Sequence, residues 1–361
     1  MAGSGDPPEG TPEGLPGGGE DEYRSVVFDE SFVRAARIQE YSAQERMGEH
    51  ARAVRTRPAW QPRTAPGHGP RHGALALVLV IAVAFAAAIY LGARPYRPPL
   101  DQRAEPLRTT VITLAPQGAV PGGKPADLYA RSPAAQFRSG AAGVALPPAK
   151  RTAHFSESQV VAALSTAKEY LVRSALDPKV LTGGQVRPVR LLLDPDQLEQ
   201  FDRSARSPAD DGRHAATGWL VRFDPSEVAL ADPAPRVRGT LRVTEVLPDA
   251  LEVTSDHTFV YALRPAGADG DTADASLFTV RRELRFRFDR EDLRMHRAEL
   301  VASHVLAGPQ ACSTDPAPEM RPLLAGRRAT AESTAGTDPY ATGRVTTPLC
   351  GTLAPGAQPS P

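Results

Sequence analysis

Ser165 and Lys168 are the residues whose types and spacing come nearest to a catalytic pattern. They spell S-x-x-K, in which the serine is the acylated nucleophile of penicillin-binding proteins and β-lactamases. The companion motifs are missing, because Ser255 and Asp256 are followed by His257 instead of Asn. We therefore interpret Ser165 and Lys168 as surface positions of a helix, and the sequence predicts a non-enzymatic protein without catalytic residues.

Histidines are the next candidates, because imidazole is a common metal ligand. They are scattered, without an H-E-x-x-H motif and without cysteines at ligand spacing. The sequence therefore predicts no metal site and no cofactor. The histidines concerned are His154, His214, His257, His296 and His304.

Three arginines share one face of a predicted strand. Arg281, Arg285 and Arg287 alternate with apolar residues in FTVRRELRFRF, so one face packs and the other presents guanidinium groups. Guanidinium suits bidentate contact with phosphate, which makes an anionic wall polymer a candidate ligand. A solvated strand face is the simpler interpretation of the same pattern.

The two cysteines, Cys312 and Cys350, both lie near the end of the chain. An even pair favours a disulfide, and closing a loop of this size would contribute roughly 3 to 4 kcal/mol. Two free thiols are the alternative.

The composition limits how much of the chain can fold. With 36 Pro and 30 Gly against 6% aromatic residues, we expect one folded domain in 361 residues. The basic residues are mostly arginine, which is typical of a high-GC genome such as that of an actinobacterium. Arginine content is therefore no indication of nucleic-acid binding, and the formal net charge is zero.

An apolar run from Ala74 to Ala93 carries no charge. Twenty residues at about 1.5 Å each match a hydrocarbon core of roughly 30 Å. The run starts too late in the chain for a cleaved signal peptide. The sequence therefore predicts one transmembrane helix at 74–93, a single-pass protein of the cell membrane, with the N-terminus cytoplasmic and the C-terminal domain extracytoplasmic.

Before this run, residues 1–22 have the composition of a disordered acidic arm and residues 51–73 that of a basic juxtamembrane linker. Residues 23–50 fit an amphipathic helix capped by Asp29. Its apolar residues have no core to join, so we interpret them as a motif that docks on a partner, with contact to the inner membrane face as the alternative. The predicted docking residues are Val26, Val27, Phe28, Phe32 and Val33.

The string SVVFDESFVRAA, followed by SAQERM, resembles an N-terminal signature shared by a group of streptomycete single-pass membrane proteins. Some members of that group are associated with the spore-wall synthesis complex. The resemblance covers about 25 residues of the arm and transfers no catalytic residue. It implies membership of a wall-building assembly.

After the apolar run we expect a Pro-rich tether at 94–149, an α+β domain at 150–308 and a disordered tail at 309–361. Ser156 and Gln159 form a capping box for a helix from His154 to Asp177, and a second capped helix begins at Asp194. Strands follow at Trp219–Phe223, Thr240–Leu247, Thr258–Leu263, Phe278–Phe288 and His296–Leu306.

This order predicts a long helix packed on a curved antiparallel sheet, which resembles the NTF2-like or cystatin-like class. The resulting hypothesis is a non-enzymatic membrane component of a cell-envelope assembly that acts through protein–protein contacts. The rival hypothesis is a sensor or carrier domain for a lipid, a glycan or an anionic wall polymer.

Overall fold

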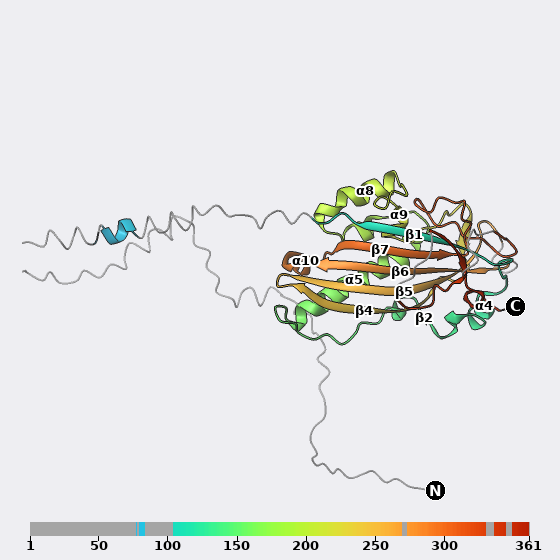
Figure 1. Ribbon diagram of the computed structural model, residues 1–361, viewed down its shortest axis with the longest axis horizontal. Coiled ribbons are helices and arrows are strands. Elements are labelled where there is room, and N and C mark those ends of the chain that lie inside the picture. Colours follow the sequence, from blue (N-terminus) through green and yellow to red (C-terminus); the bar gives the residue numbers. More distant parts are fainter. Residues whose placement is uncertain are drawn as a thin grey trace, which may run out of the picture. The chain divides into compact units, whose positions relative to one another are not determined.

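The computed structural model divides the chain into two units, Met1–Arg94 and Pro95–Pro361 (Figure 1). It describes residues 77, 79–83, 104–268, 273–329, 336–343 and 349–360.

In the first unit the described residues, 77 and 79–83, are helical. The continuous part, 79–83, rises about 7.5 Å, a quarter of the roughly 30 Å of a hydrocarbon core. None of the described helices is long and apolar enough to cross a membrane. The predicted transmembrane helix at 74–93 is therefore wrong, as are the membrane localisation and the cytoplasmic and extracytoplasmic placement that depended on it.

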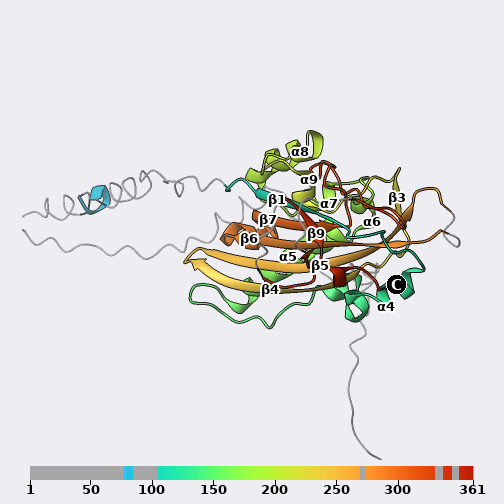
Figure 2. The ribbon, with the colours of Figure 1, turned by 45° about the vertical axis from the view of Figure 1, so that its right-hand side comes forward.

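The second unit combines short helices with one sheet (Figures 1 and 2). Its strands are β1 (Arg108–Ala115), β2 (Arg138–Ser139), β3 (Val228–Leu230), β4 (Arg236–Leu247), β5 (Ala250–Pro265), β6 (Ser276–Phe288), β7 (Glu299–Gly308), β8 (Gly336–Thr337) and β9 (Cys350–Leu353). Its α-helices are α4 (Pro125–Ala130), α5 (Glu157–Ala175), α6 (Pro178–Leu181), α7 (Arg187–Arg190), α8 (Leu198–Arg206), α9 (Ala216–Trp219) and α10 (Arg290–Met295). Its 3-10 helices are η1 (Pro133–Gln136), η2 (Gly140–Gly143), η3 (Pro195–Gln197) and η4 (Pro355–Ala357).

The nine strands form one mixed sheet in the order β2-β4-β5-β6-β7-β1-β9-β8, with β3 paired to β5 off this path. Strands β4 to β7 are antiparallel, whereas β1 runs parallel to both β7 and β9. The predicted α+β class, NTF2-like or cystatin-like with a purely antiparallel sheet, is therefore wrong. The parallel strands come from residues 108–115 and 350–353, where the sequence predicts a tether and a disordered tail.

Helix α5 begins as its sequence predicts. The Ser156 side chain accepts a hydrogen bond from the Gln159 backbone N–H, and the Gln159 side chain accepts one from the Ser156 N–H at 2.9 Å. Its last turn is tied to the sheet, because the Tyr261 hydroxyl donates to the Ala175 carbonyl at 2.7 Å. The capping box is confirmed.

The second predicted cap, at Asp194, is confirmed. Asp194 accepts from the Asp196 N–H, but the Gln197 side chain turns away from the cap. Its amide donates to the carbonyls of Glu105 and Leu300 and accepts from the Leu300 N–H. Gln197 therefore fastens η3 and α8 to the start of β7.

Residues Trp219–Phe223 form no strand, although the sequence predicts one. Trp219 ends α9, and Leu220 after it is extended. The chain then lies against α5, because the Val221 N–H donates to the Ser174 carbonyl at 2.8 Å. A short apolar run occurs in buried strands and in buried segments outside a sheet. Its composition therefore does not show which of the two it forms.

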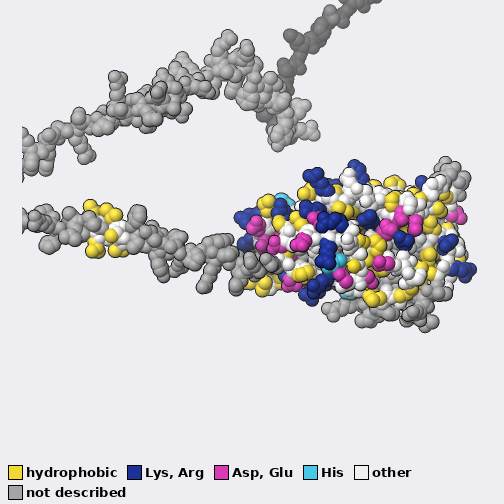
Figure 3. All heavy atoms as spheres, turned by 90° about the horizontal axis from the view of Figure 1, so that it is seen from above, with side chains coloured by type: hydrophobic (Ala, Val, Ile, Leu, Met, Phe, Trp, Pro, Cys, Tyr) yellow, Lys and Arg dark blue, Asp and Glu magenta, His cyan; other side chains and the backbone are white. Residues whose placement is uncertain are grey.

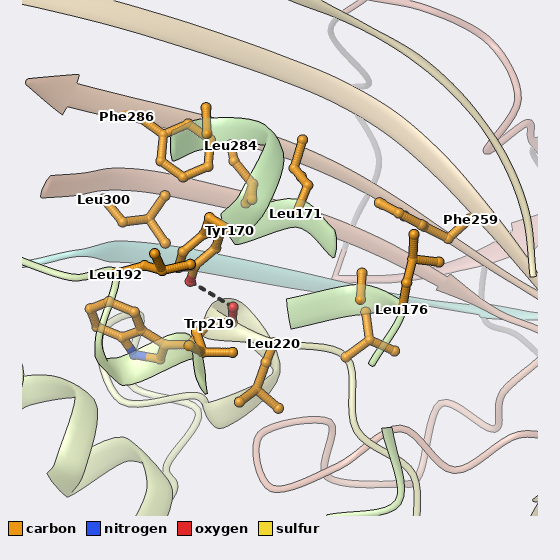
Figure 4. Close-up of a cluster of buried hydrophobic side chains, with 14 of the residues drawn as sticks. Tyr170, Leu171, Leu176, Leu192, Trp219, Leu220, Phe259, Leu284, Phe286 and Leu300 are labelled. Carbon is orange, nitrogen blue, oxygen red and sulfur yellow. Dashed lines mark hydrogen bonds between the residues drawn. The ribbon is translucent and has the colours of Figure 1, made fainter. Parts of the chain in front are cut away.

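The main hydrophobic core lies between the sheet and the helices on the α5 side. Figure 4 shows Tyr170 of α5 between Phe286 of the sheet and Trp219 of α9. The rings of Tyr170 and Phe286 meet edge to face, with centroids 5.3 Å apart, and the Tyr170 hydroxyl donates to the Trp219 carbonyl at 2.7 Å.

A second core covers part of the opposite face of the sheet. It joins Tyr129 of α4 and Phe137 to Val260, Tyr340 and Leu353. The remaining half of that face has no apolar cover from the described residues, and this half is where polar side chains gather.

Candidate functional site

The uncovered half of the sheet carries a row of polar side chains on neighbouring strands. Register places Thr254 opposite Arg285, Glu252 opposite Arg287 and Glu283 opposite His304, and directly opposed residues share a face. Arg285 and His304 are exposed and the others are half-buried. We call these six residues, Glu252, Thr254, Glu283, Arg285, Arg287 and His304, the open face.

Arg281 lies on the same side of the sheet but is buried, with 2% of its side chain exposed. Its Nε and Nη2 atoms each donate to Asp256 at 2.8 Å, and Nη2 also donates to the Gly343 carbonyl at 2.7 Å. This guanidinium therefore ties the C-terminal segment to the sheet, away from the solvent that a polymer would occupy.

Arg285 and Arg287 are more accessible and also have carboxylate neighbours. Arg285 Nε lies 3.7 Å from Glu252 Oε1, and Arg287 Nη1 lies 3.2 Å from Glu105 Oε1 and 3.6 Å from Glu299 Oε1. The hydrogen bond from Arg287 lowers the pKa of the Glu105 carboxyl, whereas burial raises that of Glu299. The open face is thus a mosaic of both signs, and its contact with an anionic polymer stays a prediction.

The other predicted residues fall into three sets. The disulfide between Cys312 and Cys350 is present, with Cα atoms 5.5 Å apart, which confirms that prediction. The predicted docking residues Val26, Val27, Phe28, Phe32 and Val33 lie outside the described residues, and so does the whole of 23–50. On α5, Ser165 is exposed and Lys168 is half-buried, as their interpretation as surface positions requires.

Sequence reasoning missed Arg282, which is completely buried on the α5 side of β6. It donates to Ser174 Oγ at 2.8 Å and to the carbonyls of Gly218 and Trp219 at 3.1 and 2.8 Å. Burial lowers the pKa of this guanidinium. The signal was available, because Arg282 occupies the apolar phase of the alternation between Val280 and Leu284.

Ser255 and His257 form a second buried polar pair beside Arg282. Ser255 Oγ lies 2.8 Å from His257 Nδ1, and neither residue has exposed surface. Burial lowers the pKa of His257 to about 4, so the imidazole is neutral at pH 7. A serine and histidine in contact resemble a nucleophile and its base, but no substrate reaches an atom that solvent cannot reach.

Three carboxyls meet where α10 leaves β6. Burial, followed by the neighbouring charges of Asp289 and Asp194, raises the pKa of Asp292 to about 8. An unfolded aspartate titrates near 3.9, so the folded chain holds an extra proton between about pH 4 and pH 8. This contribution to stability is complete below pH 4 and is lost as the pH rises through 8.

Asp292→Asn is therefore expected to stabilise the protein at alkaline pH. The amide cannot ionise and keeps an oxygen that accepts the Asp289 N–H. We expect the change in the free energy of unfolding to be more favourable at pH 8 than at pH 6.5 by about 1–2 kcal/mol. Urea unfolding at both pH values measures this change, with Glu291→Gln on the exposed side of the same helix as control. Equal effects at the two pH values would contradict the assignment.

A hollow of about 310 Å³ lies between α8 and the start of β1. Arg203, Arg213 and His214 line it, together with amide and carboxylate side chains. Figure 3 views the domain from the α8 side, where Lys and Arg side chains gather next to acidic ones. The His214 imidazole is held by Asp211, and this hydrogen bond lowers the pKa of the Asp211 carboxyl to about 2.

Comparisons with protein-family models, with curated proteins and with solved structures found no match to this chain.

Proposed function

We propose that the protein is a non-enzymatic component of a cell-envelope synthesis assembly and that it acts through protein–protein contacts. Two observations support the proposal: the resemblance of the arm to proteins associated with spore-wall synthesis, and the mixed charge of the open face.

The open face is the observation that carries the proposal. Glu283 and Arg285 stand on one strand, two residues apart, with His304 and Glu252 on its neighbours. Strands hold these charges at fixed spacing, so they suit a partner whose own charges alternate in sign. A uniformly anionic polymer would meet the carboxylates as well as the guanidinium groups, and is therefore the poorer fit.

Exchanging the signs on the open face tests the proposal. The double variant Glu283→Arg with Arg285→Glu keeps the net charge, so non-specific attraction is unchanged. We expect affinity capture of the full chain to recover envelope-synthesis proteins about tenfold less with this variant than with the parent. Glu169→Arg with Arg173→Glu exchanges the signs of an exposed pair on α5 and also keeps the net charge. This double variant is the matched control and is expected to recover the parental set.

Recovery of the same proteins by the exchanged variant, with an unchanged circular dichroism spectrum, would reject the open face as the contact. A parent that recovers no envelope-synthesis protein would reject the proposed function itself.

The hollow beside α8 favours a second candidate function, the binding of a glycan. Its volume and its lining of guanidinium, imidazole, amide and carboxylate groups suit a sugar rich in hydroxyl groups. Calorimetry with soluble wall-glycan fragments tests it. Binding that falls about tenfold in Arg203→Gln with Arg213→Gln, but not in Arg187→Gln, would support this candidate, and no heat of binding would remove it.

A further inference from the structure

The outer edge of β4 lacks a neighbouring strand over most of its length. Strand β2 has two residues and pairs with Arg236 and Val237 alone. From Arg238 to Leu247, the described part of the chain supplies no backbone hydrogen bond on that side. The unpaired side therefore extends from the third residue of β4 to its last.

The register shows which groups are free. The Gly140 N–H donates to the Pro235 carbonyl at 2.8 Å, so the carbonyl of Pro235 points outward. Outward and inward groups alternate with a period of two along an antiparallel strand. Gly239, Leu241 and Val243 therefore direct their N–H and C=O groups outward, in line for an added strand.

The protein's own chain passes this edge without pairing with it. The segment 144–153 leads from Gly143, which lies against Val237, to His154, whose N–H donates to the Glu245 side chain at 3.0 Å. It contains Pro147 and Pro148, which have no N–H to donate and cannot continue a ladder. This segment therefore leaves the outward groups of β4 without a backbone partner, and an added strand would displace the segment from the edge.

The charge along the edge indicates what that chain carries. Arg238 and Arg242 are exposed on the same face, with Thr240 between them. Arg242 has no hydrogen bond or ion pair to the described residues, and Arg238 stacks over the Phe137 ring at 4.5 Å, which leaves its charge unneutralised. An added strand would place a side chain diagonally between the two guanidinium groups, where a carboxylate is favoured.

A second copy of the same edge is the poorer occupant. Two antiparallel β4 strands would bring Arg238 and Arg242 of each copy together on one face, and like charges on adjacent strands repel. Arginines on an exposed edge are a means by which sheets avoid pairing with themselves.

We propose that the outer edge of β4, from Gly239 to Val243, binds an extended acidic segment of a partner protein as an added strand. Backbone hydrogen bonds supply the affinity, and Arg238 and Arg242 select carboxylate side chains at alternate positions. This inference rests on the proposed function in protein–protein contact and names the chemistry of the partner.

Fluorescence anisotropy with short synthetic peptides tests it on the full chain. We expect a peptide that alternates Glu and Val to bind at least about tenfold tighter than one that alternates Lys and Val. Val243→Pro removes an outward N–H while the inward ladder to β5 remains, and should reduce binding about tenfold, whereas Val243→Ala should not. Arg242→Glu keeps every backbone group and should reverse the preference for the Glu peptide.

Hydrogen exchange provides a second measurement. In the free chain the amides of Gly239, Leu241 and Val243 should exchange faster than those of Thr240 and Arg242, and the Glu peptide should protect them. Equal binding of both peptides, binding insensitive to Val243→Pro and Arg242→Glu, or dimerisation that Val243→Pro abolishes would overturn the proposal. Loss of captured partners in the exchanged open-face variant, together with no peptide binding, would leave the proposed function standing and reject the edge.

Discussion

Arg282→Ala is expected to lower the free energy of unfolding by about 3–5 kcal/mol. The substitution empties the space of a large side chain that has no exposed surface. It also removes the donors that join β6 to Ser174 of α5 and to the carbonyls of Gly218 and Trp219 in α9. One side chain connects three elements, so its loss affects the packing between the helices and the sheet.

Arg282→Met is expected to cost much less, and this contrast identifies the cause. The Gly218 carbonyl also accepts from Ser303 Oγ at 2.7 Å, and the Trp219 carbonyl from the Tyr170 hydroxyl at 2.7 Å. Both carbonyls therefore keep a donor when the guanidinium is gone. Methionine also fills much of the space and removes the cost of burying a charge.

Urea unfolding of the parent and both variants measures these differences. We expect the methionine variant to recover at least half of the stability that the alanine variant loses. If both variants are equally unstable, the guanidinium hydrogen bonds, and not the volume of the side chain, hold α9 to the sheet. If neither is destabilised, the buried contacts of Arg282 contribute nothing to stability.

Local signals in the sequence predicted the elements better than their arrangement. The cap of α5 depends on Ser156 and Gln159, three residues apart, and it was predicted correctly. The parallel pairing of β1 with β7 joins Arg108 to Ala302, and no pattern within either segment contains the other. The mixed sheet therefore could not be derived from periodicity, which reports the phase of a strand and not its neighbours.

In the candidate site, too, local sequence predicts the placement of side chains on a strand but not their partners from distant segments. Alternation along β6 correctly placed Arg281, Arg285 and Arg287 on one face, but their carboxylate partners come from β5, β7 and the chain before β1. Whether an arginine is free or paired depends on those distant segments. The open edge of β4 is likewise a property of topology, because an edge strand and a central strand can have the same alternation.

Removing the disulfide is the second change with a large expected effect. Cys350 begins β9, which continues the sheet beyond β1, and Cys312 follows β7. The bond closes a loop with a sequence separation of 38, for which loop-closure entropy predicts a contribution of about 4 kcal/mol, with measured values of 2–4 kcal/mol typical. Cys312→Ser with Cys350→Ser should therefore lower the free energy of unfolding by about 2–4 kcal/mol.

A reducing agent supplies the matched control. It should destabilise the parent to the level of the double serine variant and leave that variant unchanged. This comparison distinguishes the stability that the disulfide contributes from any stability lost by placing serine at the two positions. Strand β9 has four residues and pairs with β1 over three of them, so without the bond its amides should exchange hydrogen before those of β5 and β6. If the parent and the variant unfold at the same urea concentration, the second core around Tyr340 and Leu353 is sufficient to hold the C-terminal segment on the sheet.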